Sequence, residues 1–130
     1  MKIHHIGYLV RNVEKAKVKF LALGYKEISE KFFDEGRGIF ILFMEKNGYV
    51  VELVEPHGEK SVVAGIYKKL RNSPYHICYE SDTFEADMSM LRREGFLPIS
   101  SSEPAPAISG KNVIFLMHSE LGMIELIENR

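Results

Sequence analysis

Two histidines and two glutamates stand at matching places in two similar segments of this 130-residue sequence. His5 begins the motif His-Ile-Gly-Tyr and His76 begins His-Ile-Cys-Tyr, while Glu52 and Glu125 each lie in an apolar stretch near the end of their segment. The four side chains offer two imidazole nitrogens and two carboxylate oxygens, a donor set that suits a divalent ion such as Ni, Co, Zn, Mn or Fe. We therefore predict one metal site formed by all four residues.

Both glutamates are expected on apolar faces of strands. Side chains alternate along a strand, so Glu52 shares its face with Val50 and Val54, and Glu125 has a similar apolar setting. Burying a lone carboxylate there is costly unless a cation, a hydrogen-bond network or water in an open groove compensates it. The same His-to-Glu arrangement occurs over 47 positions in one segment and 49 in the other, and this repetition favours a shared metal ion.

The two segments are copies of one another. From His5 to Ile28 the first segment matches the second at a constant offset of 71 positions, and this match includes the Leu-Gly-Tyr and Glu-Gly-Phe triplets. Later in each segment the offset is 73: residues 40–44 match residues 113–117, and residues 51–55 match residues 124–128. We infer an internal duplication, with the extra residues placed in loops, where insertions cost little.

Each copy is predicted to be a βαβββ unit, which makes the fold class α+β. Asn12 and Asp82 are the expected N-caps of the two helices. The chain is predicted to be a single domain over residues 1–130, with one unit at about 1–56, a connector at 57–74 that holds a short helix at 61–70, and a second unit at about 75–130. The predicted strands cover residues 3–10, 25–33, 39–45, 49–55, 75–80, 97–101, 112–118 and 122–127, and residues 100–111 are predicted as a loop.

Composition restricts the classes of partner. Seventeen basic and eighteen acidic residues give a net charge of −1, so no global field attracts nucleic acid or an anionic membrane. No apolar run reaches the roughly 20 residues that span a bilayer, and the single cysteine, Cys78, cannot form an internal disulfide. We expect a cytoplasmic protein with neither a nucleic-acid nor a membrane partner.

The paired starts and the endings Val-Glu-Leu-Val-Glu-Pro and Met-Ile-Glu-Leu-Ile-Glu resemble the vicinal oxygen chelate superfamily of glyoxalases, bleomycin resistance proteins and dioxygenases. The resemblance covers nearly the whole chain and implies tandem βαβββ units that form a cupped eight-stranded mixed sheet around a metal. The family's metal positions correspond to His5, Glu52, His76 and Glu125. Residues 52–78 are most similar to methylmalonyl-CoA epimerases, although Lys60-Ser61-Val62 stands where that pattern usually has Asp-Ser-Pro, and Tyr75 where it usually has His. The ligand set is equally similar to that of bacterial glyoxalase I.

The expected reaction is metal-assisted proton transfer at a carbon next to a carbonyl, with Glu125 and Glu52 as candidate bases. The substrate would be a coenzyme A thioester, as in an epimerase, or a glutathione hemithioacetal, as in glyoxalase I (lactoylglutathione lyase). A non-catalytic binding protein is the rival class, although such family members typically lack the metal residues. Extradiol dioxygenase is ranked low because four protein ligands leave little room for a diol and oxygen. The family resemblance also implies a homodimer.

Overall fold

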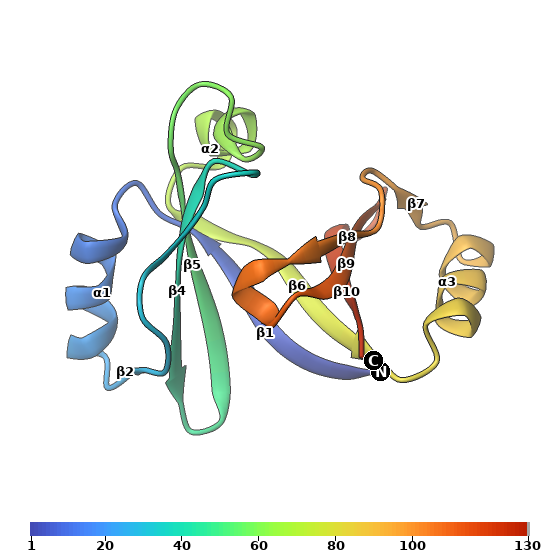
Figure 1. Ribbon diagram of the computed structural model, residues 1–130, viewed down its shortest axis with the longest axis horizontal. Coiled ribbons are helices and arrows are strands. Elements are labelled where there is room, and N and C mark those ends of the chain that lie inside the picture. The colour runs from blue at the N-terminus through green and yellow to red at the C-terminus, as the bar shows by residue number, and fades with distance from the viewer. Residues whose placement is uncertain (130) are drawn as a thin grey trace. The chain divides into compact units, whose positions relative to one another are not determined.

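The computed structural model describes residues 1–129, so the expected end of the second unit at residue 130 lies outside the described part. The chain divides into two compact units. The first unit comprises His5–Tyr75, and the second comprises Met1–His4 together with the chain from His76 onward. Each is a βαβββ unit, which confirms the α+β class (Figure 1). The organisation as a single domain stays a prediction.

The first unit is a mixed sheet with one helix on its face. Its strand order is β2-β4-β5-β1, and β3 also pairs with β4. Strands β1 and β5 are parallel, and the other pairs are antiparallel. The elements are β1 (Lys2–Leu9, of which His5 onward belongs here), α1 (Val13–Ala22), β2 (Lys26–Glu27), β3 (Phe32–Asp34), β4 (Ile39–Lys46), β5 (Tyr49–Pro56) and α2 (Ala64–Leu70).

The second unit repeats this arrangement. Its strand order is β6-β10-β9-β7, with β8 also paired to β9, and β6 and β10 are parallel. The elements are β6 (Ser73–Ser81, of which His76 onward belongs here), α3 (Phe84–Arg93), β7 (Leu97–Pro98), β8 (Glu103–Ala105), a 3-10 helix (Pro106–Ile108), β9 (Lys111–His118) and β10 (Gly122–Glu128). The segment predicted as a loop at 100–111 therefore contains a short strand and a helical turn.

The second strand of each copy is divided in two, so the described residues form ten strands where eight were expected. A serine hydroxyl marks each division. Ser29 Oγ accepts a hydrogen bond from the Phe43 N–H at 3.0 Å, and Ser100 Oγ accepts one from the Phe115 N–H at 3.0 Å. The hydroxyl replaces a backbone carbonyl in the ladder, and β3 and β8 resume pairing further along the same neighbouring strand.

The predicted match of residues 40–44 with residues 113–117 was wrong by one position. Phe43 lies opposite Glu52 in the first unit, and Phe115 lies opposite Glu125 in the second, so β4 and β9 correspond at an offset of 72 and not 73. The reason is turn length: Lys46 pairs with Tyr49 across two residues, whereas His118 pairs with Gly122 across three. Because the turn between β9 and β10 has one more residue, each residue of β9 pairs one position away from where an offset of 73 would place it.

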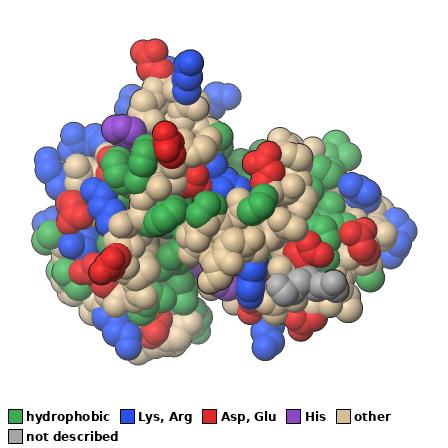
Figure 2. All heavy atoms as spheres, viewed as in Figure 1, with side chains coloured by type: hydrophobic (Ala, Val, Ile, Leu, Met, Phe, Trp, Pro, Cys, Tyr) green, Lys and Arg blue, Asp and Glu red, His purple; other side chains and the backbone are tan. Residues whose placement is uncertain are grey.

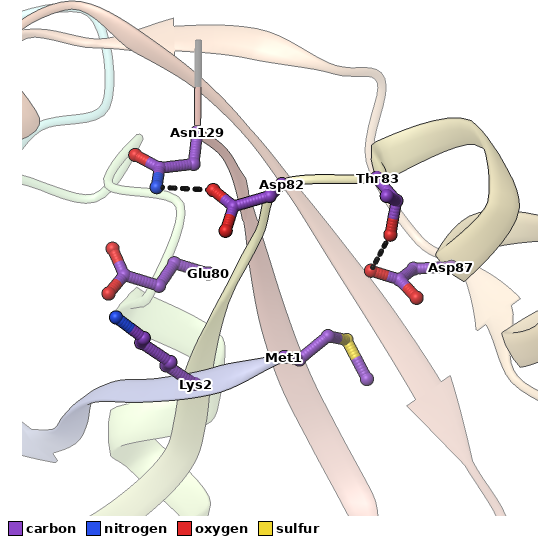
Figure 3. A pocket seen from close by; sticks show the side chains of 7 residues that line it. All are labelled: Met1, Lys2, Glu80, Asp82, Thr83, Asp87 and Asn129. Atoms are coloured by element: carbon purple, nitrogen blue, oxygen red, sulfur yellow. Dashed lines mark hydrogen bonds between the residues drawn. The ribbon is translucent and has the colours of Figure 1, made fainter.

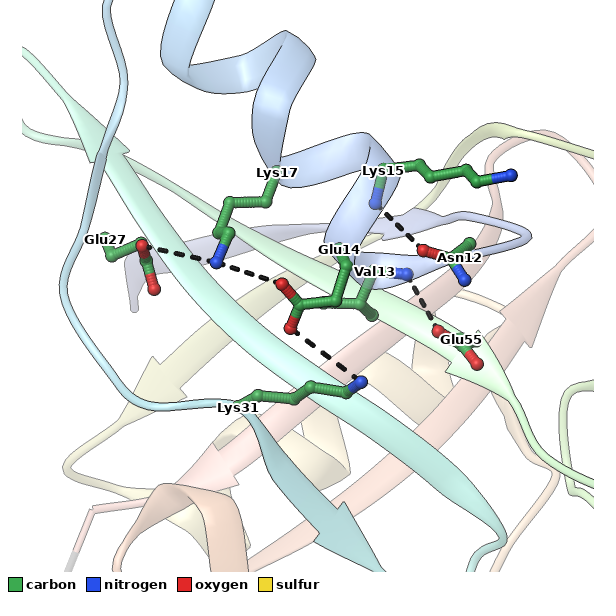
Figure 4. A network of polar contacts seen from close by, with 8 residues as sticks. All are labelled: Asn12, Val13, Glu14, Lys15, Lys17, Glu27, Lys31 and Glu55. Carbon is green, nitrogen blue, oxygen red and sulfur yellow. Dashed lines mark hydrogen bonds and ion pairs between the residues drawn. The ribbon is translucent and has the colours of Figure 1, made fainter.

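Helix α1 begins where the sequence predicts, because two acceptors satisfy its first N–H groups (Figure 4). Asn12 Oδ1 accepts from the Lys15 N–H at 2.9 Å, and Glu55 Oε1 accepts from the Val13 N–H at 2.8 Å. Beside them Lys17 pairs with Glu14 at 3.0 Å; this contact lowers the pKa of Glu14 and raises the pKa of Lys17.

Two other helix starts differ from the predictions. The residue before α3 is Thr83 and not Asp82. Helix α2 begins at Ala64 and not at residue 61, because Ser61 to Val63 form the preceding turn. None of the described helices is long and apolar enough to cross a membrane.

In each unit one helix, α1 or α3, packs on one face of the sheet through an apolar core. In the first unit α1 packs over β4 and β5 through a cluster that contains Val13, Leu42, Met44 and Leu53. In the second unit α3 contributes Met88 and Leu91 to a cluster with Ile114, Leu116, Ile124 and Leu126. Basic and acidic side chains are interspersed over the surface in view in Figure 2. In both units the helix covers one face, and the predicted site residues project from the other.

Candidate metal centre

The first unit brings His5 and Glu52 together. His5 Nε2 lies 3.4 Å from Glu52 Oε1, and the two residues are only 1% and 6% exposed. Parallel pairing of β1 with β5 places them on adjacent strands, and Glu52 points away from the α1 core because its neighbour Leu53 points into it. A buried carboxylate on this apolar face is therefore compensated by an imidazole at close range.

The second unit repeats the pair with the corresponding atoms. His76 Nε2 lies 3.1 Å from Glu125 Oε1, and both residues are 4% exposed. The strands β6 and β10 that carry them are parallel neighbours, as β1 and β5 are. Each unit thus places one imidazole nitrogen beside one carboxylate oxygen, two atoms of the kind that could hold a metal ion. The metal site predicted for all four residues stays a prediction.

An aromatic ring lies against each site histidine, and neither ring was predicted from the sequence. The centroids of the His5 and Phe43 rings are 5.5 Å apart at 76°, and those of His76 and Phe115 are 5.4 Å apart at 88°. Each phenylalanine lies directly across the ladder from the site glutamate. Its backbone is held on both sides, by the serine hydroxyl described above and by an N–H donated to its carbonyl, from Ile28 or Ile99.

This edge-to-face contact restricts rotation of the imidazole and keeps Nε2 directed at the carboxylate. We expect Phe115→Leu to weaken divalent-ion binding about tenfold, the lower end of the effect of removing a residue that orients a metal ligand. Isothermal titration with Co or Zn measures it. Phe96→Leu is the matched control, because Phe96 packs on the α3 side of the same unit. It should lower the free energy of unfolding by about 1 kcal/mol without changing ion affinity; equal ion affinities in the two variants would refute the role of Phe115.

The neighbouring glutamates Glu55 and Glu128 point to the other face, as their strand parity predicts. Glu55 lies opposite Phe40 and accepts the Val13 N–H at the start of α1. Glu128 Oε1 accepts a hydrogen bond from Asn112 Nδ2 at 3.3 Å. Glu55 and Glu128 therefore stabilise neighbouring backbone and side chains, and variants at these positions can serve as controls for variants of Glu52 and Glu125.

A separate acidic cavity of about 280 Å³ lies within the second unit, where β6 leads into α3 (Figure 3). Two of its carboxylates accept hydrogen bonds from neighbouring side chains: Asn129 Nδ2 donates to Asp82 Oδ1 at 2.8 Å, and Thr83 Oγ1 donates to Asp87 Oδ2 at 3.2 Å. The buried Ser81 hydroxyl also donates to Asp87. None of the four predicted site residues lines this cavity; the residues that do are Met1, Lys2, Glu80, Asp82, Thr83, Asp87 and Asn129.

The sequence profile of the Glyoxalase/Bleomycin resistance protein/Dioxygenase superfamily matches residues 4–115. The chain therefore belongs to that superfamily. It is 28% identical over 116 residues to the ethylmalonyl-CoA/methylmalonyl-CoA epimerase of Cereibacter sphaeroides, which covers 88% of this chain and 87% of the relative. It is 29% identical over 128 residues to the mitochondrial methylmalonyl-CoA epimerase of Bos taurus, covering 96% of this chain and 73% of the relative. Among solved structures, a hypothetical protein from Bacillus halodurans C-125 superposes with a TM-score of 0.85 at 25% identity, covering 99% of this chain and 94% of that one.

Proposed function

We propose that the chain is a metal-dependent enzyme that moves a proton at the carbon next to the carbonyl of a coenzyme A thioester, as an epimerase does. The observation that carries the proposal is the repeated buried His–Glu pair, once in each unit. Relatives named as epimerases of methylmalonyl-CoA support the choice of substrate class.

We also propose that the two His–Glu pairs bind one ion together. The four side chains supply two imidazole nitrogens and two carboxylate oxygens, all nearly excluded from solvent. This borderline donor set fits Ni, Co, Zn, Mn or Fe, and it holds no thiolate. Held by these four residues, an ion would supply Lewis-acid stabilisation of the substrate carbonyl, which would favour loss of the neighbouring proton.

The chain's own contribution is a pair of carboxylates. Glu125, released from the ion, would accept the proton from the acidic carbon of one epimer. Glu52, also released from the ion and already protonated, would donate its proton to the opposite face to give the other epimer. In the reverse direction the two residues exchange roles. His5 Nε2 and His76 Nε2, which lie beside the carboxylates, would hold the ion. The buried apolar surroundings exclude water that would compete for the proton.

Deuterium exchange tests this function. The metal-loaded protein in D2O should incorporate deuterium at C2 of methylmalonyl-CoA, followed by NMR, and dialysis against a chelator should abolish the exchange. Restoring the divalent ion should restore it. If the thioester does not exchange while a glutathione hemithioacetal is converted, the chain is instead a glyoxalase I, which moves the proton to the adjacent carbon and does not return it to the same one. If the protein binds either compound with no reaction, it is a binding protein.

The homodimer, predicted from the family resemblance, and the cytoplasmic location, predicted from the composition, remain predictions. Light scattering coupled to size-exclusion chromatography measures the first, with twice the 14.9 kDa chain mass as the expected result.

A further inference from the structure

Beside the His76–Glu125 pair, the second unit carries a row of apolar side chains on the same sheet face. Leu97 pairs with Met117 across β7 and β9, Met117 pairs with Met123 across β9 and β10, and Met123 pairs with His76 across β10 and β6. Cross-strand neighbours have Cβ atoms about 5 Å apart, so the row is continuous up to the site histidine. The next row along the strands holds Phe115 and Glu125.

This row is open to solvent although it is apolar. Leu97 is 67% exposed, Met117 is 38% exposed and Met123 is half-buried. Helix α3 covers only the opposite face of the sheet. At the other end of the site face, β8 and the 3-10 helix cover Cys78, Val113 and Ile127 with Ala105 and Ile108. Within the described residues of the second unit, the apolar row is therefore the part of the Glu125 face that neither α3 nor the β8 segment covers.

The same row in the first unit is charged. Lys26 pairs with Glu45 across β2 and β4, and Glu45 pairs with Val50 across β4 and β5. These three positions correspond to Leu97, Met117 and Met123. Both copies keep the histidine, the phenylalanine and the glutamate of the site, so the change from Lys and Glu to Leu and Met is specific to this row. The fold does not require apolar residues at these positions, because the first unit has the same strand arrangement with Lys26 and Glu45 there.

We propose that Leu97, Met117 and Met123 form an apolar strip that binds the aliphatic part of a thioester substrate next to the His76–Glu125 pair. The strip presents neither charge nor a hydrogen-bonding side chain, so its occupant is a hydrocarbon: the alkyl branch at the reacting carbon. The proposal rests on the proposed function and adds the part of the substrate that this unit recognises.

The test is the dependence of binding on the length of the alkyl branch. Isothermal titration of the metal-loaded protein with 2-methyl-, 2-ethyl- and 2-propylmalonyl-CoA should show the dissociation constant falling about fourfold for each added methylene. Met117→Glu places in the strip the residue found at the corresponding first-unit position, and it should flatten this dependence to within about twofold. Leu97→Lys should act in the same direction. Leu121→Lys is the matched control, because Leu121 is 69% exposed but lies in the turn between β9 and β10; it should leave the dependence unchanged.

A dependence on branch length that survives Met117→Glu overturns the strip. So does a Met117→Glu variant that converts a dimer to a monomer while the dependence stays intact, because the occupant is then a second copy of the chain. Wild-type protein that shows the dependence without deuterium exchange supports the strip and removes only the proposed reaction. Failure of all three thioesters to bind removes both.

Discussion

Glu125→Gln is expected to slow epimerisation of methylmalonyl-CoA by roughly 10² to 10⁴-fold, the usual contribution of a positioned general base. Glutamine keeps the shape of the side chain and a neutral oxygen donor but cannot accept a proton. Because each carboxylate is proposed to serve one face of the reacting carbon, Glu125→Gln and Glu52→Gln should differ in a specific way. Each variant should still exchange deuterium into the one epimer that faces its intact carboxylate, without inverting it. Stereospecific NMR of the recovered thioester distinguishes the two.

Glu128→Gln is the control for this experiment. Glu128 lies three residues further along β10 on the opposite face and contacts Asn112. Its replacement should leave the epimerisation rate within about twofold, as expected for a surface substitution away from the site. A Glu125→Gln variant that retains the wild-type rate would show that Glu125 is not the base, even if it still binds metal.

His5→Ala and His76→Ala should each weaken divalent-ion binding by more than about 100-fold, beyond the effect of losing a residue that only orients a ligand. The loss should be similar for the two variants although the histidines belong to different units, because one ion is proposed to need both. Isothermal titration at constant pH measures the affinity. The pH must be fixed, since the ligands bind metal only when deprotonated.

Each unit offers a control histidine. His57 in the first unit is exposed and contacts Phe33 and Phe40, and His118 in the second unit contacts the Glu94 carbonyl at 3.0 Å. Alanine at either position should leave ion affinity unchanged. If His5→Ala retains the affinity of the wild type while His76→Ala loses it, the ion belongs to one pair alone and the shared site is wrong.

The sequence singled out His5, Glu52, His76 and Glu125 as one metal site, because strand alternation and the duplication can both be read from side-chain types. The structure shows the contact of His5 with Glu52 and of His76 with Glu125, and the shared site stays a prediction. The partners of these residues were not predictable in the same way. Residues 40–44 and 113–117 are uninterrupted apolar runs, so nothing in them distinguishes an offset of 72 from one of 73. The lengths of the two hairpin turns determine which offset holds. With an offset of 72, Phe43 and Phe115 are equivalent, and each lies against the histidine of its unit.

Other differences have similarly local causes. Ser29 and Ser100 divide the second strand of each copy through one side-chain hydrogen bond. Ser29 lies in a polar stretch and Ser100 begins a run of three serines, so nothing in the sequence indicates which hydroxyl pairs with the neighbouring strand. Asp82 and Thr83 are adjacent and both favour helix starts, so composition cannot choose between them. The apolar strip of the second unit became visible only when the ladder register showed that Leu97 and Met117 occupy the positions of Lys26 and Glu45.

The number of divalent ions bound per chain tests the central claim most directly. Elemental analysis of protein loaded with Co or Zn and dialysed free of excess metal should give one ion per chain, lost in the His5→Ala and His76→Ala variants alike. Two ions per chain would mean that each His–Glu pair binds its own, and no bound ion would mean that the pairs are buried imidazole–carboxylate contacts without a metal. Either of these results would contradict the shared metal centre.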